Sequence, residues 1–310
     1  NTAFIAPYVI DQIDGNIIYA GSSVIAKSTN GGNNWNVRNS PVFDRNLFLS
    51  MELSPQNPDI LYAATAPSNS RRGHVYVTQD GGDSWADVTQ DLPDRYPMDM
   101  TVSPDDPAVA YITFSGFGTG HVFRTADFGA TWEDISFDLP DVPTNAVVVD
   151  PLFPNNVYVG NDIGVFYSRD AGLTWERYQA GLPSAVMVFD MKVSPLNRKL
   201  RIATHGNGAY QNDLIEGDIS SSEDFVSLAF KLFPNPTSDQ ATMQYELKQT
   251  ARVQIDLLDV NGRLLNRLVD EQQVAGAQQI SIDIANQVAG VYWLRIQMGQ
   301  QSVVQQLVKN

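Results

Sequence analysis

One short stretch of sequence occurs four times in the first 175 residues and constrains the fold more than any other feature. Each copy has a hydroxyl residue, then Asp or Asn two positions later, Gly four positions later and Trp seven positions later. The copies are Ser28, Asn30, Gly32 and Trp35; Thr78, Asp80, Gly82 and Trp85; Thr125, Asp127, Gly129 and Trp132; and Ser168, Asp170, Gly172 and Trp175. The Trp residues are spaced by 50, 47 and 43 residues. Self-similarity in this range indicates stacked or radial repeats.

Each residue type in the stretch has a physical role in a turn. The stretch lies between two apolar runs, which predicts a hairpin. An Asp side chain accepts hydrogen bonds from backbone N–H groups one or two residues later, and Gly provides a position with positive φ. The Trp fixes the turn to the layer beneath, since an aromatic side chain of this size buries roughly 150–250 Å². We therefore interpret the stretch as a fold-stabilising turn and not as a catalytic group.

The rest of the repeat also has a regular order. A Ser-Pro or Asp-Pro turn and a short strand with Tyr precede the later copies, and a Leu-Pro pair follows three of them. Four short strands are predicted in each unit, and the units lie at about 1–41, 42–93, 94–140, 141–183 and 184–213. The fifth unit lacks both the Trp-containing stretch and a fourth strand. Four antiparallel strands in each repeat indicate an all-β fold, a β-propeller of four-stranded blades.

The number of blades stays open. Five blades form a closed ring if residues 1–5 supply the missing strand of the fifth unit. Alternatively, the five repeats belong to a larger propeller with further blades upstream, which is the arrangement that we expect. The sequence begins at Asn1 without a signal-peptide pattern, so we expect a mature form or part of a longer chain.

The repeated stretch resembles the Asp-box, or BNR, repeat of sialidases, sortilin-type receptors and xyloglucanase-like glycoside hydrolases. The resemblance covers roughly residues 1–213. It implies a propeller in which each box lies on the rim of a blade, away from the ligand site. It implies little about activity, because one fold supports many functions.

Composition excludes several classes of function. The net charge is −15, and residues 225–310 contain seven Lys or Arg and seven Asp or Glu, so the acidic excess lies in residues 1–224. Such a surface repels nucleic acid, whose binding requires a basic footprint. The absence of Cys excludes disulfides and thiolate metal sites. No apolar run is long enough to span a bilayer.

The last third of the chain has a different character. Residues 214–230 contain three consecutive Ser residues with acidic neighbours, which predicts a linker. Alternation of apolar and polar residues follows, and Asn261 with Gly262 forms a strong signal for a two-residue hairpin turn. About seven short strands predict a small Ig-like β-sandwich over residues 231–310.

This tail resembles the type A C-terminal sorting domain of the type IX, or Por, secretion system. The residues that carry the resemblance are Pro234, Asn235, Pro236, Asn261, Gly262, Gly290, Tyr292 and Lys309. It implies export to the surface or medium of a Gram-negative bacterium. It also implies binding of the folded tail by the secretion translocon and its outer-membrane shuttle protein, and often removal of the tail at the surface. The alternative is an ordinary Ig-like accessory domain.

Residues with metal- or ligand-binding chemistry are scattered. His74 and His121 each lie 11 residues before a box Trp, so we expect structural roles for both. His205 lies elsewhere, and the three His residues show no metal-ligand spacing, so no metal or cofactor is expected. Arg71 and Arg72 match the geometry of a carboxylate or sulfate, although solvated loop charges are commoner.

A ligand site is expected where loops converge around the propeller axis. The loops after the Leu-Pro pairs open on the same face as the inter-strand loops or on the opposite one. The inter-strand loops are residues 66–73, 114–120, 161–164 and 205–208. Inverting glycoside hydrolysis needs two carboxylates across a cleft. Asp99, Asp162 and Asp190 lie near predicted strand ends, but nothing distinguishes them from other Asp residues, so no catalytic residue is assigned.

These observations predict an exported protein whose propeller is a binding or structural module for a glycan or a protein and whose C-terminal domain directs secretion. The main alternative is a polysaccharide-degrading, xyloglucanase-like hydrolase with its active site partly upstream. A third is that the chain matters mainly as secretion cargo. Two neighbouring carboxylates that face an open cleft lined with aromatics would favour the hydrolase.

Overall fold

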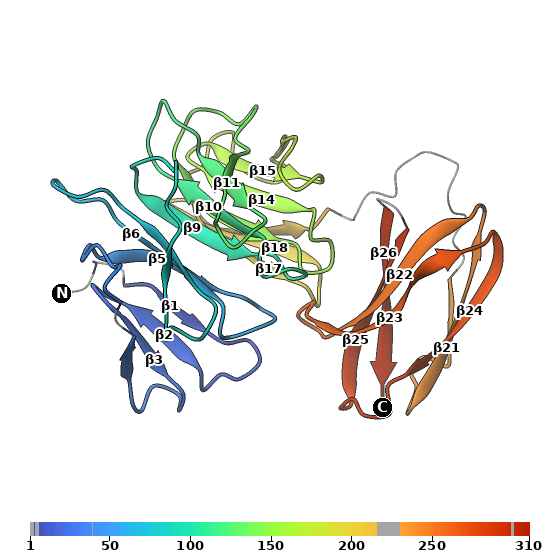
Figure 1. Ribbon diagram of the computed structural model, residues 1–310. Coiled ribbons are helices and arrows are strands. Elements are labelled where there is room, and N and C mark those ends of the chain that lie inside the picture. The colour runs from blue at the N-terminus through green and yellow to red at the C-terminus, as the bar shows by residue number, and fades with distance from the viewer. Residues whose placement is uncertain (1–2, 4–5, 39, 216–229, 299–300) are drawn as a thin grey trace. The chain divides into compact units, whose positions relative to one another are not determined.

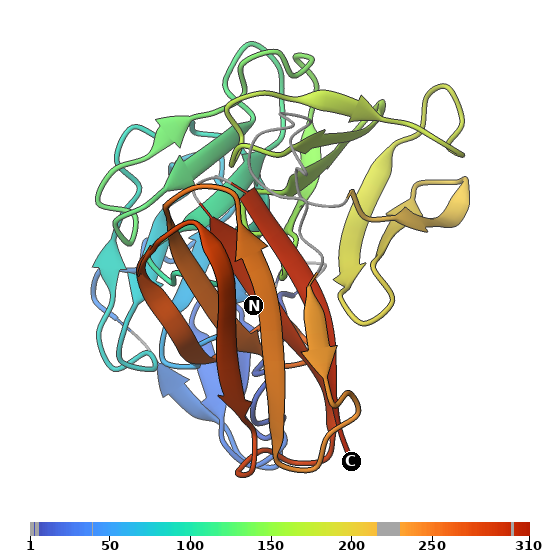
Figure 2. The ribbon, with the colours of Figure 1, turned by 90° about the vertical axis from the view of Figure 1, so that its right-hand side faces the viewer.

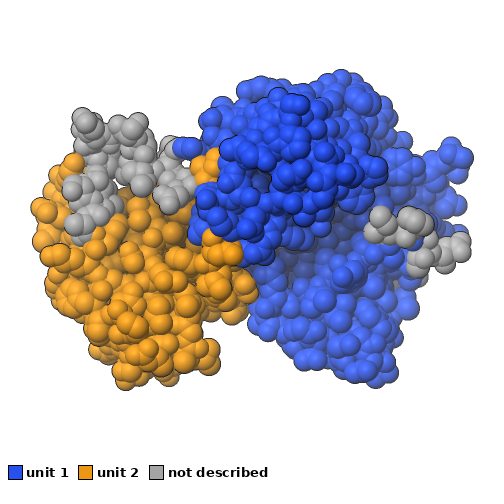
Figure 3. Space-filling view, turned by 180° about the vertical axis from the view of Figure 1, so that it is seen from behind, with its two compact units in different colours: residues 1–150, 154–194, 198–214 blue, residues 151–153, 195–197, 215–310 orange. Residues whose placement is uncertain are grey.

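The computed structural model describes residues 3, 6–38, 40–215, 230–298 and 301–310. It divides into two compact units (Figure 3). Unit 1 comprises residues 1–150, 154–194 and 198–214, and unit 2 comprises residues 151–153, 195–197 and 215–310. Most of the linker predicted at 214–230 lies outside the described residues. Within the described part of the chain, no helix is long and apolar enough to cross a membrane.

Unit 1 consists of five antiparallel sheets of consecutive strands, which we name blade 1 to blade 5 (Figure 1). Blade 1 contains β1 (Tyr8–Ile10), β2 (Ile18–Gly21), β3 (Ile25–Ser28) and β4 (Asn36–Arg38). Blade 2 contains β5 (Phe48–Leu53), β6 (Leu61–Thr65), β7 (Val75–Thr78) and β8 (Ala86–Asp87). Blade 3 contains β9 (Pro97–Val102), β10 (Ala110–Phe114), β11 (Val122–Thr125) and β12 (Glu133–Asp134). Blade 4 contains β13 (Thr144–Val149), β14 (Val157–Asn161), β15 (Gly164–Ser168) and β16 (Glu176–Tyr178). Blade 5 contains β17 (Val188–Ser194), β18 (Lys199–Thr204) and β19 (Gly208–Asp213).

The blades follow one another along an arc (Figure 2). The first strand of each blade contacts the first strand of the next, from β1 to β17. Apolar layers of buried residues lie between blades 1 and 2, blades 2 and 3, and blades 3 and 4. The second strand is wholly buried in blades 2, 3 and 4, which is why its sequence is a nearly continuous apolar run. The all-β propeller architecture predicted from the repeats is confirmed.

The second strands of blades 1 to 4 each contain a buried tyrosine, and those of blades 1 and 2 link to the next blade. The tyrosines are Tyr19, Tyr62, Tyr111 and Tyr158. The hydroxyl of Tyr19 donates to the carbonyl of Pro58 in blade 2 at 3.0 Å. The hydroxyl of Tyr62 donates to the carbonyl of Pro107 in blade 3 at 2.9 Å. The second strand of one blade and the Pro turn of the next are therefore joined by a hydrogen bond that satisfies a buried tyrosine hydroxyl.

The innermost strands of blades 2 to 5 share a β-bulge near their start. The extra residues are Leu49, Met98, Asn145 and Phe189. The residues that follow share one register position and are Ser50, Asp99, Ala146 and Asp190. A bulge changes the direction in which the next side chains point. The sequence pattern did not reveal this shared register.

The loops of unit 1 separate onto two faces. The Ser115 N–H, between the second and third strands of blade 3, donates to the Tyr96 carbonyl in the loop that enters the same blade, at 3.0 Å. The loops after the Leu-Pro pairs therefore open on the same face as the inter-strand loops, and we call this the loop face. The boxes contact the Pro turns instead, as Ala171 N–H donates to the Asn155 carbonyl at 2.9 Å. We call the opposite side the box face.

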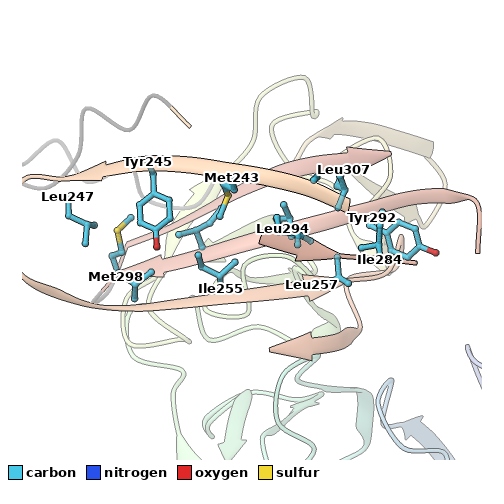
Figure 4. Packing of buried hydrophobic residues seen from close by; sticks show 14 residues of the cluster. Met243, Tyr245, Leu247, Ile255, Leu257, Ile284, Tyr292, Leu294, Met298 and Leu307 are labelled. Carbon is cyan, nitrogen blue, oxygen red and sulfur yellow. The ribbon is translucent and has the colours of Figure 1, made fainter. Parts of the chain in front are cut away.

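Unit 2 is a sandwich of two antiparallel sheets, with strand orders β20-β21-β24 and β23-β22-β25-β26. Its strands are β20 (Lys231–Phe233), β21 (Gln240–Leu247), β22 (Ala251–Leu258), β23 (Leu264–Gln273), β24 (Gly276–Asp283), β25 (Gly290–Met298) and β26 (Gln301–Lys309). Figure 4 shows Met243 of one sheet and Ile255 and Leu294 of the other within the shared core. The alternating sequence pattern follows from this arrangement, because each strand turns one face to the core.

The turn at Asn261 and Gly262 is wider than the predicted two-residue hairpin. The loop between β22 and β23 spans residues 259–263. The carboxylate of Asp259 accepts the N–H groups of Asn261 at 2.9 Å and Arg263 at 3.0 Å. Gly262 has a φ of 86°, which favours glycine. The signal marked the hairpin correctly, but the carboxylate two residues before Asn261 closes a longer loop.

Candidate functional site

All four boxes fold as the same hydrogen-bonded turn. In blade 4, Ser168 Oγ donates to Asp170 Oδ1 at 2.7 Å and accepts the Gly172 N–H at 2.8 Å. Asp170 Oδ1 also accepts the Thr174 N–H at 2.9 Å, and Oδ2 accepts the Thr174 hydroxyl at 2.8 Å. The carboxylate is thus occupied by its own turn, which leaves it little capacity to bind a ligand.

The first box shows which part of the aspartate the turn requires. Asn30 Oδ1 accepts the Ser28 hydroxyl at 3.1 Å and the Asn34 N–H at 2.8 Å, as the Asp residues do elsewhere. One side-chain oxygen is therefore enough to shape the turn. Where the residue is Asp, the bonds also stabilise its charge: the side chain and backbone of Ser84 lower the pKa of Asp80 to about 2.

In blades 3 and 4, the box tryptophan is hydrogen-bonded to the preceding blade. Trp132 Nε1 donates to the Val88 carbonyl in blade 2 at 2.8 Å. Trp175 Nε1 donates to the Ile135 carbonyl in blade 3 at 2.8 Å. The box Gly approaches the same residue, since a Cβ on Gly172 would lie 2.3 Å from Ile135 Cδ1. Gly is therefore required for close approach as well as for its φ of 97°.

Trp35 departs from the expectation that each box indole is fixed to a neighbouring layer. It is 43% exposed, whereas Trp85 and Trp175 are each 7% exposed. Its Nε1 donates to the Gly32 carbonyl of its own turn at 2.9 Å. The physical reason is that no blade precedes blade 1 among the described residues, so the indole has no neighbouring surface to cover it.

The loop face of blade 3 contains an open cavity of about 490 Å³. Its polar and aromatic lining includes Thr119, His121, Asp134, Ser136, Phe137 and Asp141. Phe137 is 57% exposed, and Phe117, next to the lining residue Gly118, is 63% exposed. The cavity has the size of a small-ligand site and combines polar groups with aromatic surface.

The carboxylate of Asp141 is held in place within this cavity. It accepts the Gly118 N–H at 2.7 Å and contacts His121 Nε2 at 2.9 Å. These hydrogen bonds hold the pKa of Asp141 below its ordinary value, so the group stays ionised at neutral pH and accepts hydrogen bonds. The sequence pointed to the loop at residues 114–120, which supplies part of this lining, but it did not indicate Asp134 and Asp141.

The three histidines lie apart from one another. His74 and His121 occupy the same position in the repeat, but their partners do not. His74 Nδ1 contacts Asp87 Oδ2 at 2.8 Å, whereas His121 Nε2 contacts Asp141 Oδ1 at 2.9 Å. His205 is exposed in the loop between β18 and β19. Within the described residues, no group of three or more His, Cys, Asp or Glu side chains is arranged to hold a metal ion.

A second charged group lies on the innermost strands. Asp99 and Asp190 share the register position after the bulge, and Glu52 and Lys192 each lie two residues beyond that position. Asp99 Oδ2 accepts the Val147 N–H of blade 4 at 2.9 Å. Burial raises the pKa of Glu52 to about 8 and that of Asp99 to about 6, against the opposing effect of the Lys192 charge. Carboxyl groups with raised pKa values are suited to donate protons near neutral pH.

The other residues considered from the sequence hold loops together. Asp162 Oδ1 accepts Asn145 Nδ2 at 2.9 Å. Arg72 donates to the Leu92 carbonyl, which ties the loop before β7 to the loop that follows the second box. Arg71 Nη1 donates to the Asp44 carbonyl at 3.4 Å. These contacts account for the polar side chains without a ligand.

Motif residues of the tail fasten the last strand to the rest of the sandwich. Asn235 Nδ2 donates to the Gln306 carbonyl at 2.8 Å, and its Oδ1 accepts the Val308 N–H at 2.9 Å. Lys309 Nζ donates to the Ile284 carbonyl at 2.7 Å. These side chains therefore act within the fold, where they fix the two ends of the domain to each other.

Other motif residues also serve the fold of the tail. The hydroxyl of Tyr292 donates to the Val288 carbonyl at 2.6 Å. Pro234 and Pro236 each follow a cis peptide bond, and Gly290 begins β25 with a φ of 159°. Any surface that the secretion machinery reads is thus built on a backbone that these residues shape.

Family models match both parts of the chain. Residues 231–310 match the secretion system C-terminal sorting domain, and residues 166–177 match the BNR/Asp-box repeat. No curated protein matches the chain in sequence.

Solved structures share the fold at low sequence identity. The GH74 enzyme of Niastella koreensis is 16% identical, with a TM-score of 0.54, over 97% of this chain and 56% of that chain. The GH74 xyloglucanase of Xanthomonas campestris is 14% identical, with a TM-score of 0.55, over 98% of this chain and 52% of that chain. An ancestral GH74 enzyme is 17% identical, with a TM-score of 0.54, over 96% of this chain and 44% of that chain. This chain therefore spans about half the length of these structures, and the likeness shows the fold alone.

The family models support the interpretation of the recurring turns as Asp-boxes and of the C-terminal sandwich as a sorting domain. The boxes form one face of a propeller, and the tail is a seven-stranded sandwich whose whole length matches the sorting-domain model. A tail of this kind marks a substrate of the type IX secretion system in a Gram-negative bacterium. The chain is therefore a secreted or cell-surface protein that carries BNR/Asp-box propeller repeats followed by a secretion system C-terminal sorting domain.

Proposed function

We propose that the propeller is a binding module for a neutral glycan and that the loop face of blade 3 takes up the sugar. The observation that carries the proposal is the open cavity of about 490 Å³ with exposed Phe117 and Phe137 beside it. A sugar presents hydroxyl donors and apolar C–H faces. Ionised Asp141 suits the donors, and the phenylalanine rings suit the apolar faces.

The charge of the chain favours a neutral sugar over an acidic one. The chain has a net charge of −15, and the excess of acid lies outside the C-terminal 86 residues. An anionic polysaccharide would be repelled by this surface and by Asp134 and Asp141 in the cavity. The propeller and the sorting domain together then give a glycan-binding protein displayed or released outside the cell.

Affinity electrophoresis with soluble neutral and acidic polysaccharides tests this proposal. We expect retardation by a neutral polysaccharide, and a loss of at least about tenfold in affinity for Phe137→Ala, because the exposed ring is the anchor. Leu173→Ala is the matched control, since Leu173 is 57% exposed in the fourth box and lies on the opposite face. Absence of binding to every polysaccharide, or equal binding by Phe137→Ala, would contradict the proposal.

A polysaccharide hydrolase is the second candidate, and one observation favours it. Glu52 and Asp99 have raised pKa values and lie on adjacent innermost strands, as a proton donor of a glycosidase would require. The measurement is release of reducing ends from the polysaccharide that binds, with Asp99→Asn as the variant. The binding proposal predicts no release by the unmodified chain, whereas the hydrolase predicts release that Asp99→Asn abolishes.

A further inference from the structure

An arginine of blade 2 joins two loops on the loop face. The Nη2 atom of Arg72, in the loop between β6 and β7, donates to the Gln90 carbonyl at 3.3 Å and also to the Leu92 carbonyl. Gln90 and Leu92 follow the box Trp of blade 2 by five and seven residues. Carbonyl oxygens of this loop are thus satisfied by a planar guanidinium group, whose donors form a fixed fork.

Blade 4 also joins its loops through an arginine, which comes from a different position. Arg177 Nη2 donates to the Ile163 carbonyl at 3.1 Å and to the Ser184 carbonyl at 3.0 Å. Arg177 follows the box Trp of blade 4 by two residues. The two blades on either side of blade 3 therefore each have a guanidinium group between the loops of this face.

Blade 3 has no arginine at either position. Two residues before the histidine that blades 2 and 3 share, Thr119 stands where blade 2 has Arg72. Two residues after the box Trp, Asp134 stands where blade 4 has Arg177. Thr119 and Asp134 both belong to the lining of the open cavity of about 490 Å³.

The carbonyl groups that accept from the arginine of blade 2 have counterparts in blade 3. Phe137 and Leu139 correspond to Gln90 and Leu92, because they also follow the box Trp by five and seven residues. Phe137 has a φ of 30° and Gln90 a φ of 44°, so the two loops share an unusual backbone conformation. Phe137 and Leu139 line the cavity, and within the described residues no donor reaches either carbonyl. The cavity thus occupies the place of the Arg72 guanidinium group.

Two carboxylates add negative charge to the same cavity. Asp141 Oδ1 accepts the Gly118 N–H and contacts His121 Nε2, and Asp134 Oδ1 accepts the Ser136 N–H at 2.9 Å. These contacts hold both groups in place but use only one oxygen of each. Within the described residues neither carboxylate pairs with Lys or Arg, and the remaining residues of 1–310 contain neither type.

A buried side chain in the wall of the cavity also has incomplete hydrogen bonding. His121 is 2% exposed and lines the cavity. Its Nε2 contacts Asp141, whereas its Nδ1 has no hydrogen-bond partner in the part of the chain that the structure describes. Buried polar atoms are nearly always hydrogen-bonded, so an unpartnered nitrogen beside a cavity favours a bound group there.

We propose that the cavity of blade 3 binds the guanidinium group of an arginine side chain from a peptide or protein partner. A guanidinium group presents five N–H donors in one plane, which suits two carboxylates and two carbonyl oxygens around one cavity. The exposed ring of Phe137 provides a face on which the delocalised cation stacks. The net charge of −15 attracts a basic partner.

A guanidinium site goes beyond the proposed binding of a glycan, because it assigns a second ligand chemistry to the same cavity. A sugar and an arginine would both contact Phe137, so they would exclude each other. The two are tested with different ligands. Failure of arginine binding therefore leaves the polysaccharide result standing, and absence of polysaccharide binding leaves the arginine result standing.

The probes are the peptide acetyl-Gly-Arg-Gly-amide and the same peptide with citrulline, whose side chain has a similar shape but no charge. Saturation-transfer NMR detects binding to the full chain, and titration calorimetry measures the affinity. We expect the arginine peptide to bind, and the citrulline peptide to bind at least about fivefold more weakly, because hydrogen bonds to a charged group are lost. Binding of the arginine peptide should also weaken as the salt concentration rises.

A first variant removes one charge from the cavity. Asp134→Asn keeps the oxygen that accepts the Ser136 N–H, so the loop should retain its conformation. We expect the arginine peptide to bind this variant at least about fivefold more weakly. Glu133→Gln is the matched control, because it makes the same change of charge at the adjacent exposed residue, which does not line the cavity.

A second variant fills the cavity from within the chain. Thr119→Arg places an arginine where blade 2 has Arg72, and it should abolish binding of the arginine peptide. Leu173→Arg is its control, because it adds the same charge at an exposed position of the box face. Circular dichroism establishes that all four variants fold.

The proposal is supported if the arginine peptide binds the unmodified chain, Glu133→Gln and Leu173→Arg, binds Asp134→Asn more weakly and does not bind Thr119→Arg. Absence of binding to the unmodified chain overturns it, as does equal binding of the citrulline peptide. Undiminished binding by folded Asp134→Asn or Thr119→Arg would also overturn it, because the peptide would then bind outside this cavity.

Discussion

Trp175 and Ile135 are 40 residues apart and form the hydrogen bond that joins blade 4 to blade 3, at 2.8 Å. The indole is buried, and Gly172 of the same box lies against the Ile135 side chain. Ile135 of blade 3 thus accepts the hydrogen bond of the Trp175 indole, packs in the same apolar cluster as that indole and lies against Gly172. The box stabilises the propeller through this joint between blades as well as through its own turn.

Removing the indole should therefore destabilise the propeller. We expect Trp175→Ala to lower the free energy of unfolding by about 3–5 kcal/mol, because a buried aromatic ring and its hydrogen bond are lost. Trp35→Ala is the control, since that indole is 43% exposed and bonds only within its own turn. Urea unfolding followed by circular dichroism measures both, and equal effects would show that the interblade contact contributes little.

The close approach of the box glycine gives a second prediction. Gly172→Ala should cost more stability than Gly181→Ala, although both positions have positive φ values of 97° and 77°. An added Cβ meets Ile135 at position 172 but nothing within 4 Å at position 181. The strain of the backbone costs about 1–2 kcal/mol at each site, and overpacking adds about 1–3 kcal/mol at position 172 alone. Thermal unfolding of the two variants checks the difference.

Stability should fall as pH rises because of Glu52. Burial raises the pKa of Glu52 from 4.5 to about 8, so between these values the folded chain retains a proton that the unfolded chain releases. The unfolded state then binds fewer protons, and the free energy of unfolding decreases with increasing pH across this window. Asp99 has the same trend up to about pH 6.

The variant Glu52→Gln removes this effect. Its melting temperature should change less between pH 5 and pH 8 than that of the unmodified chain. The stability that Glu52→Gln gains over the unmodified chain should be largest at pH 8, as the linkage relation requires. Glu133→Gln, at an exposed position of β12, serves as the control. A parallel pH dependence of Glu52→Gln and the unmodified chain would refute the role of this carboxyl group.

A buried ion pair in unit 2 should be sensitive to the loss of one partner. Asp256 Oδ2 lies 3.0 Å from Arg295 Nη2, and both side chains are at most 1% exposed. Burial alone would raise the pKa of Asp256, but hydrogen bonds from Arg267 and Arg295 outweigh it and lower the pKa. Asp256→Ala leaves a buried guanidinium without this partner, so we expect a loss of about 3–5 kcal/mol. Asp270→Ala, on the surface, should change the urea midpoint little.

Export should depend on the tail. Removal of residues 231–310 should leave the propeller in the periplasm of a bacterium that has the type IX system, because the matched sorting domain is absent. Cell fractionation and immunodetection measure the location. The unmodified chain and a Phe137→Ala chain are the controls, and both should reach the surface or medium. Normal delivery of the truncated chain would contradict the role of the tail.

The fold was largely predictable, because its signals are local and repeated. The spacing of Trp85, Trp132 and Trp175 predicted blades, and the alternating pattern predicted the tail strands. Both follow from which face of a strand is buried. The wider loop at Asn261 was not predicted, because the Asp259 carboxylate competes with the backbone in closing the turn.

The candidate sites were less predictable, because they depend on contacts between distant segments. His121 was noticed, but its pairing with Asp141 and the cavity beside it arise from two loops of blade 3 that the fold brings together. Asp99 was one of three undistinguished carboxyl groups. Only the bulged register shows that Asp99 and Asp190 occupy one position on different blades. The catalytic role stays unassigned.

The interblade hydrogen bonds of the indoles all run in one direction, from a blade to the one before it in sequence. Blade 5 has no box, so among the described residues it sends no such bond back to blade 4. The arc therefore has a polarity, and the joint between blades 4 and 5 relies instead on other side-chain bonds, such as that from Arg198 Nη1 to Asp150 Oδ1 at 2.7 Å.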